Sequence, residues 1–138
     1  MSLVDQNKDL IQRYTAAIWQ GQSVEATFCA ANIVTHNLAS ASGVPNLEQT
    51  AAYFRAALPD LSLHQTMVFG QGDRVMQHYT VKGTHSGAPL FNFPASGREL
   101  TLTGQNIFRI ADGKIVERWS IIDAADTFQQ LSAAGGQS

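Results

Sequence analysis

The stretch RELTLTGQNIFRIADGKIVERWSII, residues 98–122, decides the fold of this chain. Its Asp112-Gly113 pair is typical of a tight hairpin turn, and apolar residues alternate with polar ones on both sides of that pair. The same alternation occurs in two earlier runs, which meet at a Gly72-Asp73 turn. The second half of the chain is therefore predicted to form an antiparallel meander. Its strands, in chain order, are expected over 61–70, 74–85, 98–110 and 114–122.

The first half of the chain shows helical rather than alternating spacing. Apolar side chains recur every three or four residues from Leu10 to Ile18, so a helix is predicted over 5–20, ending at Gly21. The other predicted helices cover 23–29, 48–58 and 123–131. Helices followed by an antiparallel meander are typical of the α+β class. We expect one domain over 1–138, in which a strongly curved antiparallel sheet packs on the N-terminal helices.

Side-chain alternation assigns the strand residues to one face of the sheet or the other. The residues expected on the core face are Val75, Gln77, Tyr79, Val81 and His85 in one strand, Leu100, Leu102, Asn106, Phe108 and Ile110 in the next, and Ile115, Glu117, Trp119, Ile121 and Asp123 in the last. This assignment assumes no bulge, because a bulge turns over whatever follows it. An unpaired polar group on an inner face costs about 1–3 kcal/mol, and a charged one costs more. We therefore expect Asn106, Asp123 and His36 either to satisfy one another or to line a mostly apolar cavity.

Composition restricts the partners. The net charge is −2 and the nine Lys and Arg residues are scattered singly, which argues against nucleic acid. Charged residues make up 14%, below the roughly 25% of typical soluble domains, so surface remains for a pocket or a subunit interface. No segment is apolar enough for a signal peptide or a membrane span, so we expect no membrane partner and a cytoplasmic location. Cys29 has no second cysteine to pair with and is interpreted as a small buried hydrophobe.

Several blocks of the sequence resemble the SnoaL-like polyketide cyclases of the nuclear transport factor two-like superfamily. The matching blocks are Leu58-Pro59-Asp60-Leu61, Gly83-Thr84-His85-Ser86-Gly87, Ser96-Gly97-Arg98 and 108–119 followed by Asp123, with weaker matches at Tyr14 and Thr35-His36-Asn37. The resemblance implies a cone-shaped α+β barrel with its pocket between the curved sheet and the first helices. It also implies a homodimer or higher homo-oligomer that uses no metal or organic cofactor. Asp123, four residues after Trp119, matches the family's acid–base residue for intramolecular aldol closure.

Three side chains are the candidates for catalysis: Asp123, His36 and Asn106. Asp123 would take a proton from a carbon next to a carbonyl, and it is also suited to cap the closing helix; the two roles are compatible. His36 would orient Asp123 or polarise a carbonyl, or else bond to backbone in the core. The expected ligand-binding residues are Tyr14, Phe54, Tyr79, His85, Phe91, Phe108 and Trp119. No spacing of His, Cys and carboxylates is typical of a metal site, so none is predicted.

The function predicted from these features is cofactor-free acid–base chemistry of the aldol type on a small, apolar carbonyl compound. A non-catalytic binding protein for a small hydrophobic ligand is one alternative, and an epoxide hydrolase or dehydratase of the same fold is another. Epoxide opening would need an Asp–Arg–Asp arrangement, and the outward position expected for Arg109 counts against it. Arg109 and Glu117 are expected either to pair across neighbouring strands or to meet a partner subunit on the outer face. The loop over 86–97, with Phe91 and Phe93, is expected to cover the pocket. The outer sheet face, including Thr101, Thr103 and Gln105, is the expected subunit interface.

Overall fold

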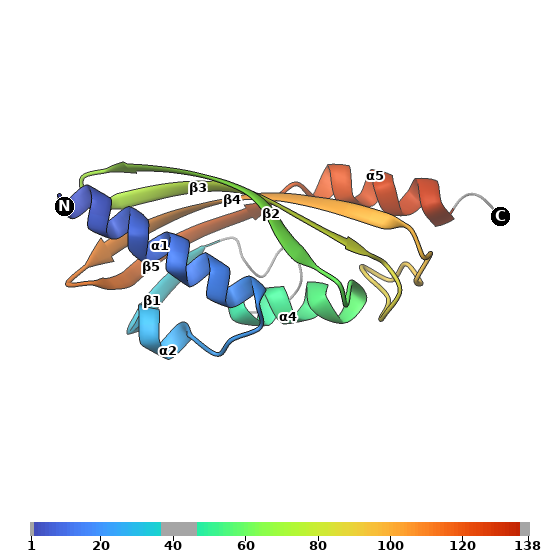
Figure 1. The fold of residues 1–138 in the computed structure, drawn as a ribbon, viewed down its shortest axis with the longest axis horizontal. Helices are drawn as coiled ribbons and strands as arrows, with labels where there is room; N and C mark the ends of the chain where they lie inside the picture. The colour runs from blue at the N-terminus through green and yellow to red at the C-terminus, as the bar shows by residue number, and fades with distance from the viewer. Residues whose placement is uncertain (1, 37–46, 136–138) are drawn as a thin grey trace.

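The computed structural model of the chain describes residues 2–36 and 47–135. In chain order, the elements are α1 (Leu3–Trp19), α2 (Glu25–Phe28), β1 (Cys29–His36), α4 (Leu47–Ala57), β2 (Ser62–Gln71), β3 (Arg74–Thr84), β4 (Glu99–Ala111), β5 (Lys114–Ile122) and α5 (Ala124–Gly135). Helices α1, α2 and α4 lie on one side of the sheet, and α5 lies at the end remote from the N-terminus (Figure 1). The α+β class is confirmed. Asn37, from one of the weaker family matches, lies outside the described residues.

Local sequence signals explain where the main elements begin and turn. Ser2 caps α1, since its hydroxyl accepts a hydrogen bond from the Asp5 backbone N–H at 3.1 Å. The hairpin between β4 and β5 turns through Asp112 at φ 52° and Gly113 at φ 74°. Two successive positive φ angles are what a two-residue type I′ turn requires, and Asp-Gly tolerates them. The predicted hairpin is confirmed for this reason.

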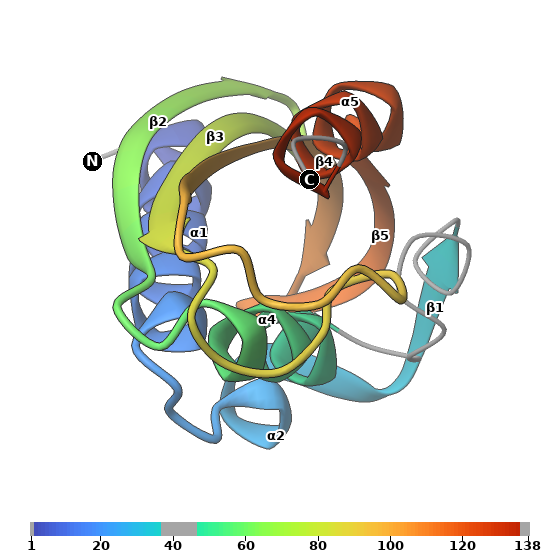
Figure 2. The same cartoon turned by 90° about the vertical axis from the view of Figure 1, so that its right-hand side faces the viewer.

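The sheet has five strands in the order β1-β5-β4-β3-β2. Strands β2 to β5 form the predicted antiparallel meander, but β1 pairs with β5 in parallel. The expectation of a purely antiparallel sheet is therefore wrong at this edge, where the Ala-rich start of β1 carries little alternation. The sheet does not close on itself. The strands curve around one side of the barrel, and α1 and α4 complete the ring (Figure 2).

The inner and outer faces of β3 and β4 match the prediction. Their buried side chains include Val75, Gln77, Tyr79, Val81, Leu100, Leu102, Asn106, Phe108 and Ile110. They pack against the buried side of α1, which contributes Ile11, Tyr14 and Ile18 to the same core. This agreement follows from the continuous register between β3 and β4, which has no interruption from Arg74 to Thr84.

Strand β5 departs from the prediction because it contains a bulge. Arg109 pairs with Glu117, whereas the next residue, Ile110, pairs with Ile115, so β5 carries one extra residue between those partners. Ile115 is buried as predicted, but beyond the bulge the faces exchange. Arg118 and Ser120 are buried, whereas Ile121 is 58% exposed. The placement of Glu117, Trp119, Ile121 and Asp123 on the core face is therefore wrong.

Candidate functional site

A cavity of about 20 Å³ lies between α1, α4 and the inner face of the sheet. It is lined by Tyr14, Thr15, Ile18, Trp19, Thr50, Gln77, Tyr79, Asn106, Ser120 and Ile122. That volume accommodates about one water molecule, whereas ligand pockets typically measure about 300–1,000 Å³. An organic molecule therefore has to displace lining side chains in order to enter.

A row of polar side chains crosses the sheet along one wall of the cavity. Gln77 on β3 pairs with Asn106 on β4, and Asn106 pairs with Ser120 on β5. The Gln77 amide donates from Nε2 to Thr15 Oγ1 at 2.5 Å, and its Oε1 accepts from Asn106 Nδ2 at 3.1 Å. Asn106 Oδ1 and Ser120 Oγ are buried without a hydrogen-bond partner. Because both residues line the cavity, a polar group that enters it can satisfy both atoms.

The cavity wall contains no carboxylate, imidazole, ammonium or guanidinium group among the described residues. Its titratable side chains are Tyr14 and Tyr79, and burial raises the pKa of both phenols above the usual value near 10. Both are therefore neutral at physiological pH. Outside the described residues, residue 1 and the segments 37–46 and 136–138 hold no Asp, Glu, His, Lys, Arg, Cys or Tyr that could add an ionisable side chain. The site is neutral.

The Tyr14 hydroxyl is held on the far side of this wall by a buried charged cluster. It donates to Glu25 Oε1 at 2.6 Å and accepts from Arg118 Nη1 at 2.8 Å. Arg118 is 1% exposed, and its Nη1 also donates to Glu25 Oε2 at 3.0 Å. Cys29 is buried as predicted, and its thiol donates to the same carboxylate at 3.3 Å. Burial, followed by the charge of Glu25, raises the pKa of this thiol to about 12, so it is no thiolate nucleophile.

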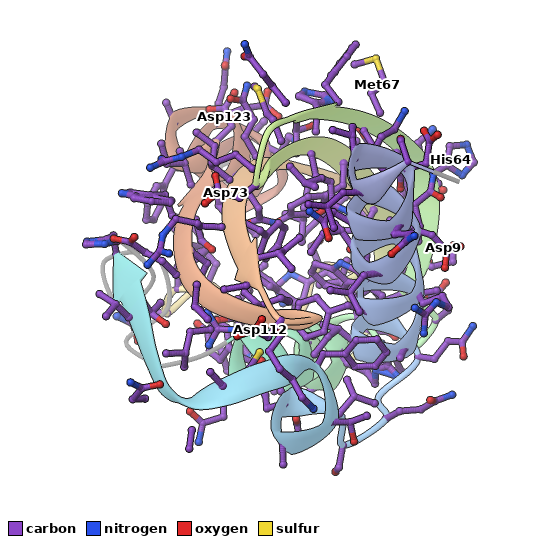
Figure 3. All side chains as sticks on the ribbon, turned by 90° about the vertical axis from the view of Figure 1, so that its left-hand side faces the viewer. Asp9, His64, Met67, Asp73, Asp112 and Asp123 are labelled. Atoms are coloured by element: carbon purple, nitrogen blue, oxygen red, sulfur yellow. The ribbon has the colours of Figure 1, made fainter. Side chains whose placement is uncertain are left out.

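Asp123 lies outside the cavity, at the start of α5. Its carboxylate accepts from the Asp126 backbone N–H at 3.0 Å, which is the geometry of a helix N-cap. The residue is exposed and borders a surface depression together with His78 and Gln105. Figure 3 shows Asp123 on the outside of the sheet. The helix-cap interpretation is confirmed, and the bulge in β5 explains why the inward placement failed.

His36 and Trp119 also lie on the outer face. The two rings stack, with centroids 5.0 Å apart and 12° between their planes, and His36 Nε2 lies 2.8 Å from Glu117 Oε2. Glu117 also accepts from Arg109 Nε at 3.0 Å, which confirms the predicted cross-strand pair. These hydrogen bonds, that of His36 first, hold the pKa of the Glu117 carboxyl below its usual value. Neither His36 nor Trp119 is brought to the cavity or to Asp123.

The remaining predicted ligand-binding residues lie either in the buried core or in the loop between β3 and β4. Phe54, His85 and Phe108 are fully buried but do not line the cavity. Phe91 lies between α4 and α5, with its ring 5.8 Å from that of Tyr53 and 5.2 Å from that of Phe128. Its backbone N–H donates to Tyr53 Oη at 2.8 Å. The loop that carries it crosses the end of the barrel below α5 (Figure 2).

Of the sequence candidates, the structure thus brings Tyr14, Tyr79 and Asn106 to the cavity. The sequence predictions missed Thr15, Ser120 and, behind the wall, Arg118 and Glu25. Among the described residues, no three His, Cys, Asp or Glu side chains are grouped as metal ligands would be. Over the same residues, no helix is long and apolar enough to cross a membrane.

The family of the chain follows from its sequence as a whole. The family model of the SnoaL-like polyketide cyclases matches residues 9–131. The chain belongs to this family. The resemblance inferred from the sequence blocks is therefore confirmed. No curated protein matches this SnoaL-like chain.

Solved structures share the fold of this SnoaL-like protein. AclR of Streptomyces galilaeus, described as a proposed hydroxylase, has a TM-score of 0.79 at 22% identity, over 94% of this chain and 83% of that one. IdmH of Streptomyces antibioticus, a proposed polyketide cyclase, has a TM-score of 0.74 at 27% identity, over 92% of this chain and 99% of its own. A proposed polyketide cyclase of Acidithiobacillus ferrooxidans has a TM-score of 0.74 at 22% identity, over 97% and 99% of the two chains. One fold therefore occurs with more than one described activity.

Proposed function

We propose that the chain binds a small, mostly apolar organic molecule in the cavity and holds one oxygen atom of that molecule at Asn106 and Ser120. The observation that carries this proposal is the pair of buried polar atoms without a partner, Asn106 Oδ1 and Ser120 Oγ, on the uncharged wall of the cavity. Ligand sites typically combine apolar walls with a few converging polar groups.

A second candidate function is ring closure in a polyketide-like carbonyl compound, which the family match favours. An aldol closure is an isomerisation: a carbon–carbon bond forms, and the proton that leaves the nucleophilic half ends on the new alkoxide oxygen. In a neutral cavity this chemistry relies on folding the substrate into a reactive shape and on hydrogen bonds to its oxygen atoms. In this proposal Asp123 takes no part in the ring closure, because it lies outside the cavity. Epoxide opening by an Asp–Arg–Asp set is not supported, since neither residue type lines the cavity in the part of the chain that the structure describes.

Replacing Asp123 with Ala tests this assignment directly. Loss of the helix cap is expected to lower the free energy of unfolding by about 1 kcal/mol. The affinity for a small, mostly apolar alcohol such as cyclohexanol, and any turnover, should stay unchanged. Urea denaturation and NMR titration of the full chain measure the two effects. Ser120→Ala is the matched control, because it removes a polar group from the cavity and is expected to weaken binding. Loss of binding or turnover in the Asp123 variant, with the fold intact, would restore Asp123 as a site residue.

We also propose that the chain forms a homodimer through the outer face of the sheet. Cross-strand pairing puts Phe69, Met76, Ile107 and Trp119 in one row across β2 to β5. Phe69 is 63% exposed, and Met76 and Ile107 are 40% and 38% exposed. Arg109 and Glu117 flank this row with both signs of charge, which suits a two-fold contact between identical surfaces. Figure 3 shows Met67 and His64, also on β2, projecting away from the barrel.

A further inference from the structure

We propose that the Asn106–Ser120 pair is a subsite that selects a hydroxyl group over a carbonyl group. The inference rests on the proposed function, because it assumes that a ligand enters the cavity. It goes further by naming the chemical class of the group that the cavity binds: an alcohol, a phenol or an enol.

The direction of the hydrogen-bond chain decides what the cavity offers. Gln77 lies between Thr15 and Asn106, donating from Nε2 to the former and accepting at Oε1 from the latter. The Asn106 amide is therefore turned with its NH₂ group toward β3, and its Oδ1 is the atom left without a partner. Gln77 is fully buried, so bulk solvent does not reach either of its ends. In this arrangement Asn106 presents an acceptor to the cavity.

Ser120 complements that acceptor. Its hydroxyl lies on the neighbouring strand, directly opposite Asn106, and is buried without a partner. A ligand O–H group can donate to Asn106 Oδ1 and accept from the Ser120 hydroxyl, which satisfies both atoms. A carbonyl oxygen can only accept, so it pairs with Ser120 and leaves Asn106 Oδ1 buried and unpaired. Because this acceptor stays unpaired, a carbonyl compound is expected to bind about tenfold or more weakly than the matching alcohol.

The preference extends to the two tautomers of a carbonyl compound. An enol carries its proton on oxygen, so it fits the pair as an alcohol does, whereas the ketone with the same atoms does not. The enol is also the tautomer whose carbon attacks in an aldol closure. The subsite would therefore select the reactive form of a polyketide-like compound from solution, without an ionised base in the cavity.

Two matched pairs of probes test the selectivity on the full chain by NMR titration. Cyclohexanol carries a hydroxyl group where cyclohexanone carries a carbonyl group. Phenol carries a hydroxyl group where toluene carries a methyl group. We expect cyclohexanol and phenol to bind about tenfold more tightly than their counterparts. Asn106→Leu removes the acceptor that only a hydroxyl can use, so it is expected to remove most of the preference. Ser120→Ala removes the donor that a hydroxyl and a carbonyl both use, so it is expected to weaken cyclohexanol and cyclohexanone alike while leaving the affinity for toluene unchanged. Ser120→Thr, which keeps the hydroxyl, should retain the affinity for both cyclohexanol and cyclohexanone.

The possible outcomes separate this inference from the proposed function. Tighter binding of cyclohexanone would overturn the inference alone, because it would mean that the Thr15–Gln77–Asn106 chain runs in the opposite direction and presents an N–H donor to the cavity. Equal affinity within each pair would overturn it as well, again leaving a ligand-binding cavity. Binding of none of the four probes would overturn the inference and the proposed function together.

Discussion

Replacing Arg118 with Met is expected to lower the free energy of unfolding by about 3 kcal/mol, a large fraction of the stability of a domain this size. The guanidinium is 1% exposed and donates to Glu25, to Tyr14 and, from Nε, to Thr35 Oγ1 at 3.0 Å. Methionine fills much of the volume but leaves the Glu25 carboxylate, whose side chain is 19% exposed, without its cation. Removing one partner of a buried pair costs more than the pair itself contributes, because the remaining charge is left unpaired.

Arg13→Met is the matched control for this prediction. The same chemical change removes the partner of Asp9 on the surface of α1, where the Arg13 side chain is 58% exposed. Water solvates the carboxylate that is left without its cation, so the effect on the free energy of unfolding is expected to be much smaller. Glu25→Gln in the Arg118→Met background should recover part of the loss, since it removes the orphaned charge. Equal destabilisation by the two Arg variants in urea denaturation would show that the Arg118 cluster is not buried as described.

Replacing Ile107 with Glu is expected to convert the proposed homodimer to a monomer. Ile107 lies between Met76 and Trp119 in the exposed apolar row, so a two-fold contact would bury two carboxylates at its centre. Burying unpaired charges is costly enough that the dimer affinity should fall about 100-fold or more. Sedimentation velocity at tens of micromolar measures the change. Leu3→Glu, at a residue 64% exposed on α1, is the control and should leave the assembly intact. A monomeric wild-type chain would contradict the proposed interface.

The sequence predicted the meander, the main helices and the faces of β3 and β4, because alternation and turn residues are local properties. It did not predict the parallel pairing of β1, which depends on a contact with the distant β5. It also misplaced most of β5, because Ile115 and Val116 are both apolar and either could face the core. A single extra residue at that point then moved Ser120 to the inner face and Trp119 to the outer one.

One sequence signal did carry the missing information about β5. The predicted Arg109–Glu117 pair required both side chains on the outer face, whereas strict alternation placed Glu117 inside with Ile115. A two-residue turn at Asp112-Gly113 pairs Ala111 with Lys114 and, without a bulge, would pair Arg109 with Val116. The two expectations are consistent only if β5 contains one extra residue. Giving the ion pair more weight than the alternation would have placed Ser120 in the cavity and Asp123 outside it.

The neutrality of the cavity is the central claim, and the pH dependence of ligand affinity tests it most directly. The titratable groups of the wall, Tyr14 and Tyr79, have raised pKa values and keep their protons throughout the neutral range. The dissociation constant of cyclohexanol, itself uncharged, is therefore expected to stay within about twofold from about pH 5.5 to about pH 8.5. A change of about tenfold that follows the titration of one group would place a carboxylate or an imidazole in the site and contradict the account.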